Sequence, residues 1–110
     1  MHISTMHASS HRPRNPMETA RTAYIDQAEA DAWEDLENEH RACARWRNLH
    51  VEGCRKDAAT RWDDARRVWD AAWSARPGDT SDKREAAFDA VVMSGLADCD
   101  DLAEAFWRIA

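Results

Sequence analysis

Two histidine–cysteine pairs have the spacing of metal ligands on a helix: His40 with Cys43, and His50 with Cys54. To share one zinc ion, all four ligand atoms would have to lie within about 2.3 Å of that ion. On a continuous helix the two pairs would lie about 15 Å apart, at a rise of about 1.5 Å per residue. The stretch between them has no reverse-turn signal that would unite the pairs. We therefore expect no metal site.

Nucleophilic catalysis is also poorly supported by the sequence. Cys43 lies one helical turn from His40, but both fall on an apolar stripe, and no third group that would orient the histidine is evident. No glycine-rich phosphate loop occurs, and the chain has only 3 glycines. We expect a non-enzymatic protein with no catalytic, metal-binding or cofactor-binding residues.

The composition predicts an all-α protein. Among 110 residues there are 3 glycines and 3 prolines, alanine is abundant and β-branched residues are scarce. The odd number of cysteines, 3, argues against a disulfide framework. No apolar run approaches the length of about 18 residues needed to span a bilayer. We expect a cytoplasmic location, and the bias to arginine and alanine suggests a bacterial or phage source.

The hydrophobic pattern predicts a single helical domain over residues 17–110, preceded by a flexible polar arm at 1–16. Met17 could also be the true start of the protein. The expected fold is a long antiparallel two-helix hairpin, at about 17–50 and 54–76, with two short C-terminal helices at about 80–93 and 98–109. Pro77 and Gly78 end the second helix.

Gly53 decides where the hairpin turns in this interpretation. A glycine suits the position just after a helix, and cations near residue 50 complement a helix C-terminus. The apolar stripes before and after Gly53 are also offset by roughly 70° if one helix is drawn through both. We therefore favour a break near residues 50–56, with one long helix through Gly53 as the alternative.

Six tryptophans are unusual in a chain of 110 residues. Trp62, Trp69 and Trp73 fall within roughly 40° of one another on a helix, so we expect them in the core. Trp33 also fits a core stripe. Trp46 and Trp107 lie beside their stripes and next to arginines, a pairing enriched in interface hot spots. The predicted partner-binding residues are Trp46, Arg45, Arg47, Trp107 and Arg108.

Charge is distributed unevenly along the chain. Seven acids and no base lie between Asp26 and Glu39, whereas arginines gather after Arg41. One alternative is therefore a nucleic-acid patch around the hairpin tip and along the arginines of the second helix, formed by Arg41, Arg55, Lys56, Arg61, Arg66 and Arg67. The opposite alternative is an acidic nucleic-acid mimic whose carboxylates are Asp31, Glu34, Asp35, Glu37, Asp98, Asp100 and Asp101. The formal net charge of −6 argues against direct nucleic-acid binding.

The leading functional hypothesis is a small protein–protein interaction module of adaptor or inhibitor type. One variant of this hypothesis is that a phage or mobile element encodes the protein. It would block or bridge a larger protein through its aromatic and arginine surface, and a homodimer through the hairpin is also plausible. The tripeptide Trp46-Arg47-Asn48 lacks the glycine of the small WXG-type helical hairpins, so we assign no family from the sequence.

Overall fold

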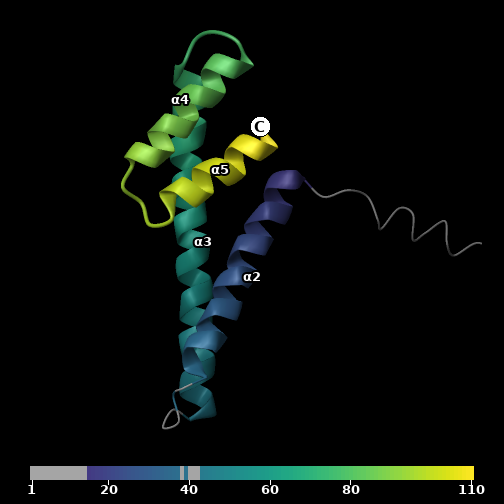
Figure 1. Ribbon diagram of the computed structural model, residues 1–110, viewed down its shortest axis with the longest axis vertical. Helices are drawn as coiled ribbons and strands as arrows, with labels where there is room; N and C mark the ends of the chain where they lie inside the picture. The colour runs from purple at the N-terminus through teal and green to yellow at the C-terminus, as the bar shows by residue number, and fades with distance from the viewer. Residues whose placement is uncertain (1–14, 38, 40–42) are drawn as a thin grey trace, which may run out of the picture.

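The computed structural model describes residues 15–37, 39 and 43–110, and these form helices joined by short loops (Figure 1). Its helices are α2 (Pro16–Leu36), α3 (Ala44–Ala75), α4 (Thr80–Met93) and α5 (Cys99–Ile109). No strand occurs in the described residues, so the all-α class is confirmed. The predicted arm at 1–16 lies almost wholly outside them; of its last two residues, Asn15 caps α2 and Pro16 begins it.

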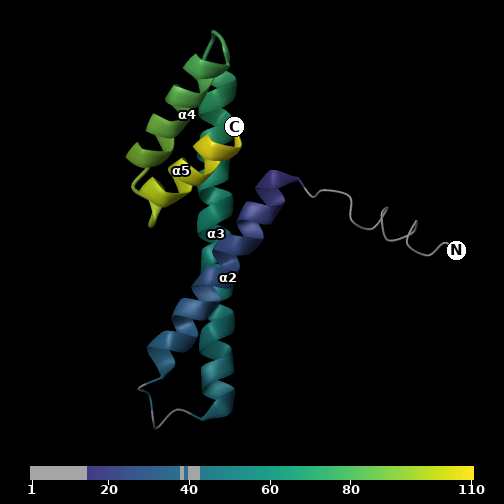
Figure 2. The ribbon, with the colours of Figure 1, turned by 45° about the vertical axis from the view of Figure 1, so that its right-hand side comes forward.

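The two long helices run antiparallel, as Figures 1 and 2 show from two directions. Arg21, early in α2, pairs with Asp63, late in α3, at 2.9 Å. Glu29, further along α2, pairs with Arg55, earlier in α3, at 2.6 Å. Helices α4 and α5 pack against the C-terminal part of α3, and α5 also contacts α2. The C-terminal pair therefore thickens one end of the hairpin only.

The predicted break near residues 50–56 is wrong. Helix α2 ends at Leu36, and α3 then runs without interruption from Ala44 to Ala75. Gly53 lies inside α3, where a glycine costs only about 1 kcal/mol relative to alanine. Burial of Val51 and Ala58 on either side of it outweighs that cost, since fully burying one valine contributes about 1.5–3 kcal/mol. The first helix is thus shorter than expected, and the second is longer.

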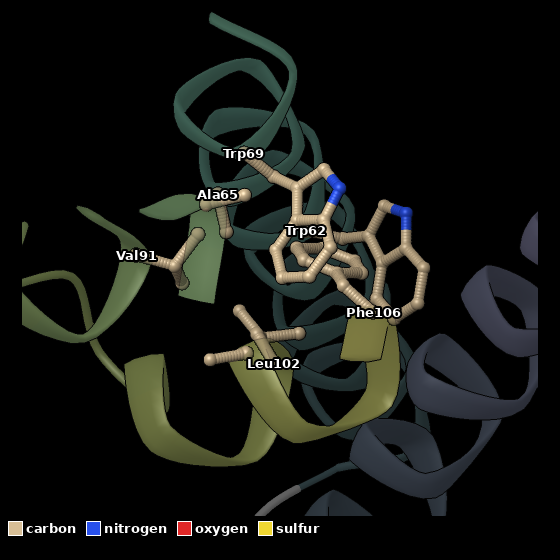
Figure 3. Packing of buried hydrophobic residues seen from close by; sticks show 8 residues of the cluster. Trp62, Ala65, Trp69, Val91, Leu102 and Phe106 are labelled. Atoms are coloured by element: carbon tan, nitrogen blue, oxygen red, sulfur yellow. The ribbon is translucent and has the colours of Figure 1, made fainter. Parts of the chain in front are cut away.

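The main core lies where α3, α4 and α5 meet (Figure 3). Phe106 of α5 is fully buried and meets the indoles of Trp62 and Trp69 edge-on, with centroids 4.8 and 5.7 Å away. Leu102 and Val91 close the other side of this cluster. Such edge-to-face pairs add about 0.5–1.5 kcal/mol beyond the burial of their area. Two tryptophans are therefore core residues, as the sequence predicted.

A smaller core lies toward the connection between α2 and α3. It consists of Ala32, Leu36 and Val51, with Cys54 packed against it. Because this end of the hairpin has only two helices around it, fewer side chains can be enclosed there. Trp33, expected in a core stripe, is 40% exposed, and that expectation is wrong. Neighbouring Ala32 takes the buried position instead.

Candidate interaction surfaces

The six indoles divide into two groups by exposure. Trp62 and Trp69 are each 2% exposed, and Trp73 is half-buried and stacked against Trp69 at a centroid distance of 6.1 Å. In contrast, Trp46 is 47% exposed, Trp33 is 40% exposed and Trp107 is 38% exposed. Trp46 and Trp107 were predicted from the sequence as partner-binding residues, whereas Trp33 was expected in the core.

Trp46 belongs to an exposed apolar face of α3. Leu49, one turn later, is 57% exposed, and the ring of His50 stacks flat on Trp46 with centroids 5.3 Å apart and planes 6° apart. Buried Val51 follows Trp46 by five residues, a rotation of about 140°. The three residues Trp46, Leu49 and His50, called here the α3 aromatic surface, therefore face away from the core.

The N-terminus of α3 fixes the position of this surface. The thiol of Cys43 accepts a hydrogen bond from the backbone N–H of Trp46 at 3.5 Å, which makes Cys43 the N-cap of the helix. Cys43 is exposed, and not buried in an apolar stripe as expected. Its candidate partner His40 lies outside the described residues.

The two arginines beside Trp46 have different roles. Nη2 of Arg47 donates to the carbonyl oxygen of Glu39 at 2.7 Å, so this side chain ties α3 to the segment that follows α2. Arg45 is exposed. Arg47 was predicted to bind a partner, and the structure gives it a contact within the chain.

A second aromatic feature lies between α4 and α5. Phe88 and Trp107 meet edge-on with ring centroids 5.5 Å apart. With Glu85 and Glu104 they line an open depression of about 480 Å³, called here the α4–α5 pocket. Each carboxylate precedes the aromatic ring of its own helix by three residues, so each helix contributes one acid and one ring to the same face.

The cations around Trp107 are engaged with the chain itself. The guanidinium of Arg84 lies 5.2 Å from the centroid of the Trp107 ring and donates to the carbonyl oxygen of Ala110 at 2.8 Å. Nε of Arg108, the other predicted partner-binding residue here, donates to the carbonyl oxygen of Glu104 at 3.4 Å. Of the pocket residues, only Trp107 was predicted from the sequence as a binding residue; Phe88, Glu85 and Glu104 were not. The repeated spacing of Glu and aromatic residue was the available signal.

Four arginines of the suggested nucleic-acid patch make ion pairs within the chain. Arg55 pairs with Asp26 and Glu29, Arg61 with Asp98, Arg66 with Asp70 and Arg67 with Asp64. Lys56 pairs with Glu52 at 3.4 Å, and Arg41 lies outside the described residues. The patch was placed at a hairpin tip, but Arg55 and Lys56 lie within α3 and no turn occurs there.

Hydrogen bonding holds two of these arginines strongly protonated. The pKa of Arg55 is raised by hydrogen bonds to Asp26 and then Glu29. The pKa of Arg61 is raised chiefly by its hydrogen bond to Tyr24. Both guanidinium groups therefore join α2 to α3.

The suggested mimic carboxylates lie in two separate places. Asp31, Glu34, Asp35 and Glu37 occupy the last two turns of α2 and the residue after it, and Asp98, Asp100 and Asp101 surround the start of α5. Asp31 and Asp35 line a depression of about 180 Å³ between α2 and α3, which Asp57 and Arg61 also line. Asp98 is not free, since it accepts a hydrogen bond from Tyr24 at 2.8 Å.

Of the His and Cys residues considered for metal or covalent chemistry, the structure describes Cys43, His50 and Cys54. Sγ of Cys54 and Nε2 of His50 are 3.7 Å apart, so this pair does meet across one turn of α3. Cys99 instead donates to the carbonyl oxygen of Val92 at 3.5 Å. In residues 15–37, 39 and 43–110, no three His, Cys, Asp or Glu side chains are arranged to hold a metal ion.

None of the four described helices combines the length and apolar character needed to cross a membrane. Comparison with family models, with curated proteins and with solved structures found no match to this chain.

Proposed function

We propose that this protein is a small non-enzymatic interaction module, of adaptor or inhibitor type, that covers part of a larger protein. The observation that carries the proposal is the α3 aromatic surface, where Trp46 and Leu49 are 47% and 57% exposed beside a stacked histidine. Trp107 adds a second exposed indole near the other end of α3.

An exposed indole gains free energy when a partner covers it. Removing apolar surface from water contributes roughly 25 cal/mol per Å², and tryptophan is among the residues that dominate interface energies. The stacking of its ring on His50 restricts the side chain of Trp46 and so lowers the entropy that it loses on binding, while the hydrogen bond from its backbone N–H to Cys43 fixes the start of the helix. A preordered, exposed indole of this kind is well suited to act as an anchor.

Affinity capture with matched variants tests the proposal. The tagged protein, its Trp46→Ala and Trp107→Ala variants and the control Met93→Ala are each incubated with a native lysate of the source organism. Met93 is 83% exposed, so the control removes a large exposed apolar side chain outside both surfaces. We expect one protein to be captured by the wild type and by the control, and to be lost with Trp46→Ala. Equal capture by all four proteins, or none by any, would contradict the proposal.

A homodimer is a variant of the same proposal, in which a second copy covers the α3 aromatic surface. Sedimentation equilibrium of the purified protein distinguishes it, because Trp46→Ala would then convert a dimer to a monomer. We further propose a cytoplasmic site of action, which is supported by the three free cysteines Cys43, Cys54 and Cys99, since reducing compartments keep thiols unpaired.

Direct nucleic-acid binding is less well supported. The described cations suggested for it are paired with carboxylates of the chain, and each pair would have to open before a phosphate could replace its acid. A gel shift at low salt with DNA and RNA checks this alternative. The acidic-mimic alternative is supported only by the depression between α2 and α3, lined by Asp31, Asp35 and Asp57. It predicts competition between this protein and nucleic acid for a basic partner.

A further inference from the structure

We propose that the α4–α5 pocket binds the side chain of an arginine carried by a basic segment of a partner protein. The pocket is formed by Glu85 and Phe88 of α4 and by Glu104 and Trp107 of α5. The inference rests on the proposed function and names the chemistry of a contact that Trp107 would make.

The aromatic part of the pocket suits a planar cation. Phe88 and Trp107 are held edge-on, at 81° between ring planes, so their faces point in different directions. The chain already places one guanidinium, that of Arg84, 5.2 Å from the centroid of the Trp107 ring. With Arg84 in place, Trp107 still has 38% of its surface exposed. The Arg84 contact shows that the indole can pair with a guanidinium, and the exposed part of the ring remains accessible to a second side chain.

The acidic part of the pocket is not neutralised by its own helices. Glu85 and Glu104 are both exposed, and neither takes part in a salt bridge in the described part of the chain. The three cations of α4 and α5 are directed to carbonyl oxygens: Lys83 to those of Trp73 and Arg76, Arg84 to that of Ala110 and Arg108 to that of Glu104. Two carboxylates without a salt bridge in the described residues therefore flank the two aromatic rings.

This combination favours arginine over other cations. A guanidinium stacks on aromatic rings through its plane and offers carboxylates two parallel N–H donors, whereas an ammonium group is a compact, strongly hydrated point charge. The volume of about 480 Å³ exceeds one arginine side chain, so neighbouring atoms of the segment can enter as well. Because the depression is open, a lone small cation would gain too little contact to bind well.

A peptide titration tests the proposal. An acetylated and amidated peptide of alternating glycine and arginine is added to ¹⁵N-labelled protein, and its citrulline counterpart, equal in shape but uncharged, serves as the ligand control. We expect shifts of the Trp107 indole N–H and of the Glu85, Phe88 and Glu104 amides with the arginine peptide, and none with the citrulline peptide. Shifts spread over the whole acidic surface, or equal shifts with both peptides, would overturn the proposal.

Two double variants, compared by their affinity for the arginine peptide, show which carboxylates bind it. Glu85→Gln/Glu104→Gln keeps the shape of the pocket and should weaken peptide binding roughly tenfold, as expected for two partly exposed ion pairs. Glu34→Gln/Glu37→Gln removes the same charge from the far end of α2 and should leave the affinity within about twofold. Equal weakening in both variants would mean diffuse electrostatic attraction and would overturn the inference.

The two proposals fail in different ways. If the peptide does not bind but Trp46→Ala still abolishes capture of a lysate protein, the pocket inference is wrong and the interaction module stands. If peptide binding maps to the pocket but no tryptophan variant alters capture, the arginine site stands without a role in capture, and the proposed function is wrong.

Discussion

The phenol oxygen of Tyr24 in α2 donates a hydrogen bond of 2.8 Å to Asp98 at the start of α5, 74 positions later in the sequence. The same oxygen accepts a hydrogen bond of 3.1 Å from Nε of Arg61 in α3. One tyrosine thus joins three helices at the point where the C-terminal pair meets the hairpin. Its pKa is raised, chiefly by burial, although the hydrogen bond from Arg61 acts in the opposite direction.

Tyr24 should therefore ionise above the ordinary tyrosine pKa of about 10. It is the only tyrosine in the chain, so absorbance of the phenolate near the red edge of the tyrosine band reports this residue alone. Folding favours the protonated phenol, so its contribution to stability is complete below the unfolded pKa and is lost as the pH rises through the folded one. A native midpoint at or below the midpoint in denaturant would contradict the raised pKa.

Gly53 gives a test of the continuous helix α3. A β-carbon at this position would meet nothing within 4 Å, so Gly53→Ala should stabilise the protein by about 0.5–1 kcal/mol. Gly95 is the matched control. A β-carbon there would also meet nothing within 4 Å, but the backbone φ of 75° is one at which alanine is strained. Urea denaturation should show opposite signs for the two substitutions. A loss of stability in Gly53→Ala would indicate a non-helical turn at that residue.

Truncation of Phe106 should lower the free energy of unfolding more than any other substitution proposed for this protein. It is 0% exposed and touches the rings of both Trp62 and Trp69, so Phe106→Ala should cost about 3–5 kcal/mol. Met93→Ala removes a comparable apolar side chain that is 83% exposed and should change the free energy of unfolding by less than about 0.5 kcal/mol. Chemical denaturation followed by tryptophan fluorescence measures both. Similar effects of the two substitutions would place the core elsewhere.

The two arginines beside Trp46 should behave differently when truncated. Arg47→Ala removes the hydrogen bond to the carbonyl oxygen of Glu39 and should cost about 1 kcal/mol of stability. Arg45→Ala at an exposed position should cost less than about 0.5 kcal/mol. If the two variants unfold at the same urea concentration, Arg47 does not stabilise the connection between α2 and α3.

The sequence predicted the helical class and the aromatic core because both follow from local periodicity. Trp62 and Trp69 are seven residues apart, which places them on one helix face whatever the rest of the chain does. The C-terminal helices were placed within one or two residues of their observed bounds, since Asp79, Gly78 and Gly95 mark their ends.

The position of the hairpin turn could not be predicted in the same way. Gly53 carries a strong turn preference, whereas the acidic end of α2 lacks any basic residue in its last turn, which is the reverse of what the helix dipole favours. Packing of Leu36 against Val51 decides the outcome, and that contact between two helices is invisible to local patterns. Trp33 was misplaced for the same reason, because only the paired helices reveal that Ala32 faces the partner.

The residues of the α4–α5 pocket could not be predicted as a site from the sequence. In the sequence, Glu85 and Glu104 are ordinary exposed acids. Only the packing of α4 beside α5 brings these carboxylates and the rings of Phe88 and Trp107 into one depression. Conversely, the Arg-rich segments suggested a nucleic-acid patch only while their acidic partners were unknown. Arg55 and Asp26, for example, are 29 positions apart and meet at 3.1 Å.

The most direct test of the central claim is hydroxyl-radical footprinting of the tryptophans, read by mass spectrometry, in the purified protein and in a native extract of the source organism. In the purified protein, Trp46 and Trp107 should be oxidised much faster than Trp62 and Trp69, which are each 2% exposed. In the extract, oxidation of Trp46 should fall several-fold while that of Met93 stays unchanged, because a partner covers the α3 aromatic surface. Identical oxidation of Trp46 in both samples would show that nothing covers it, and would contradict the account.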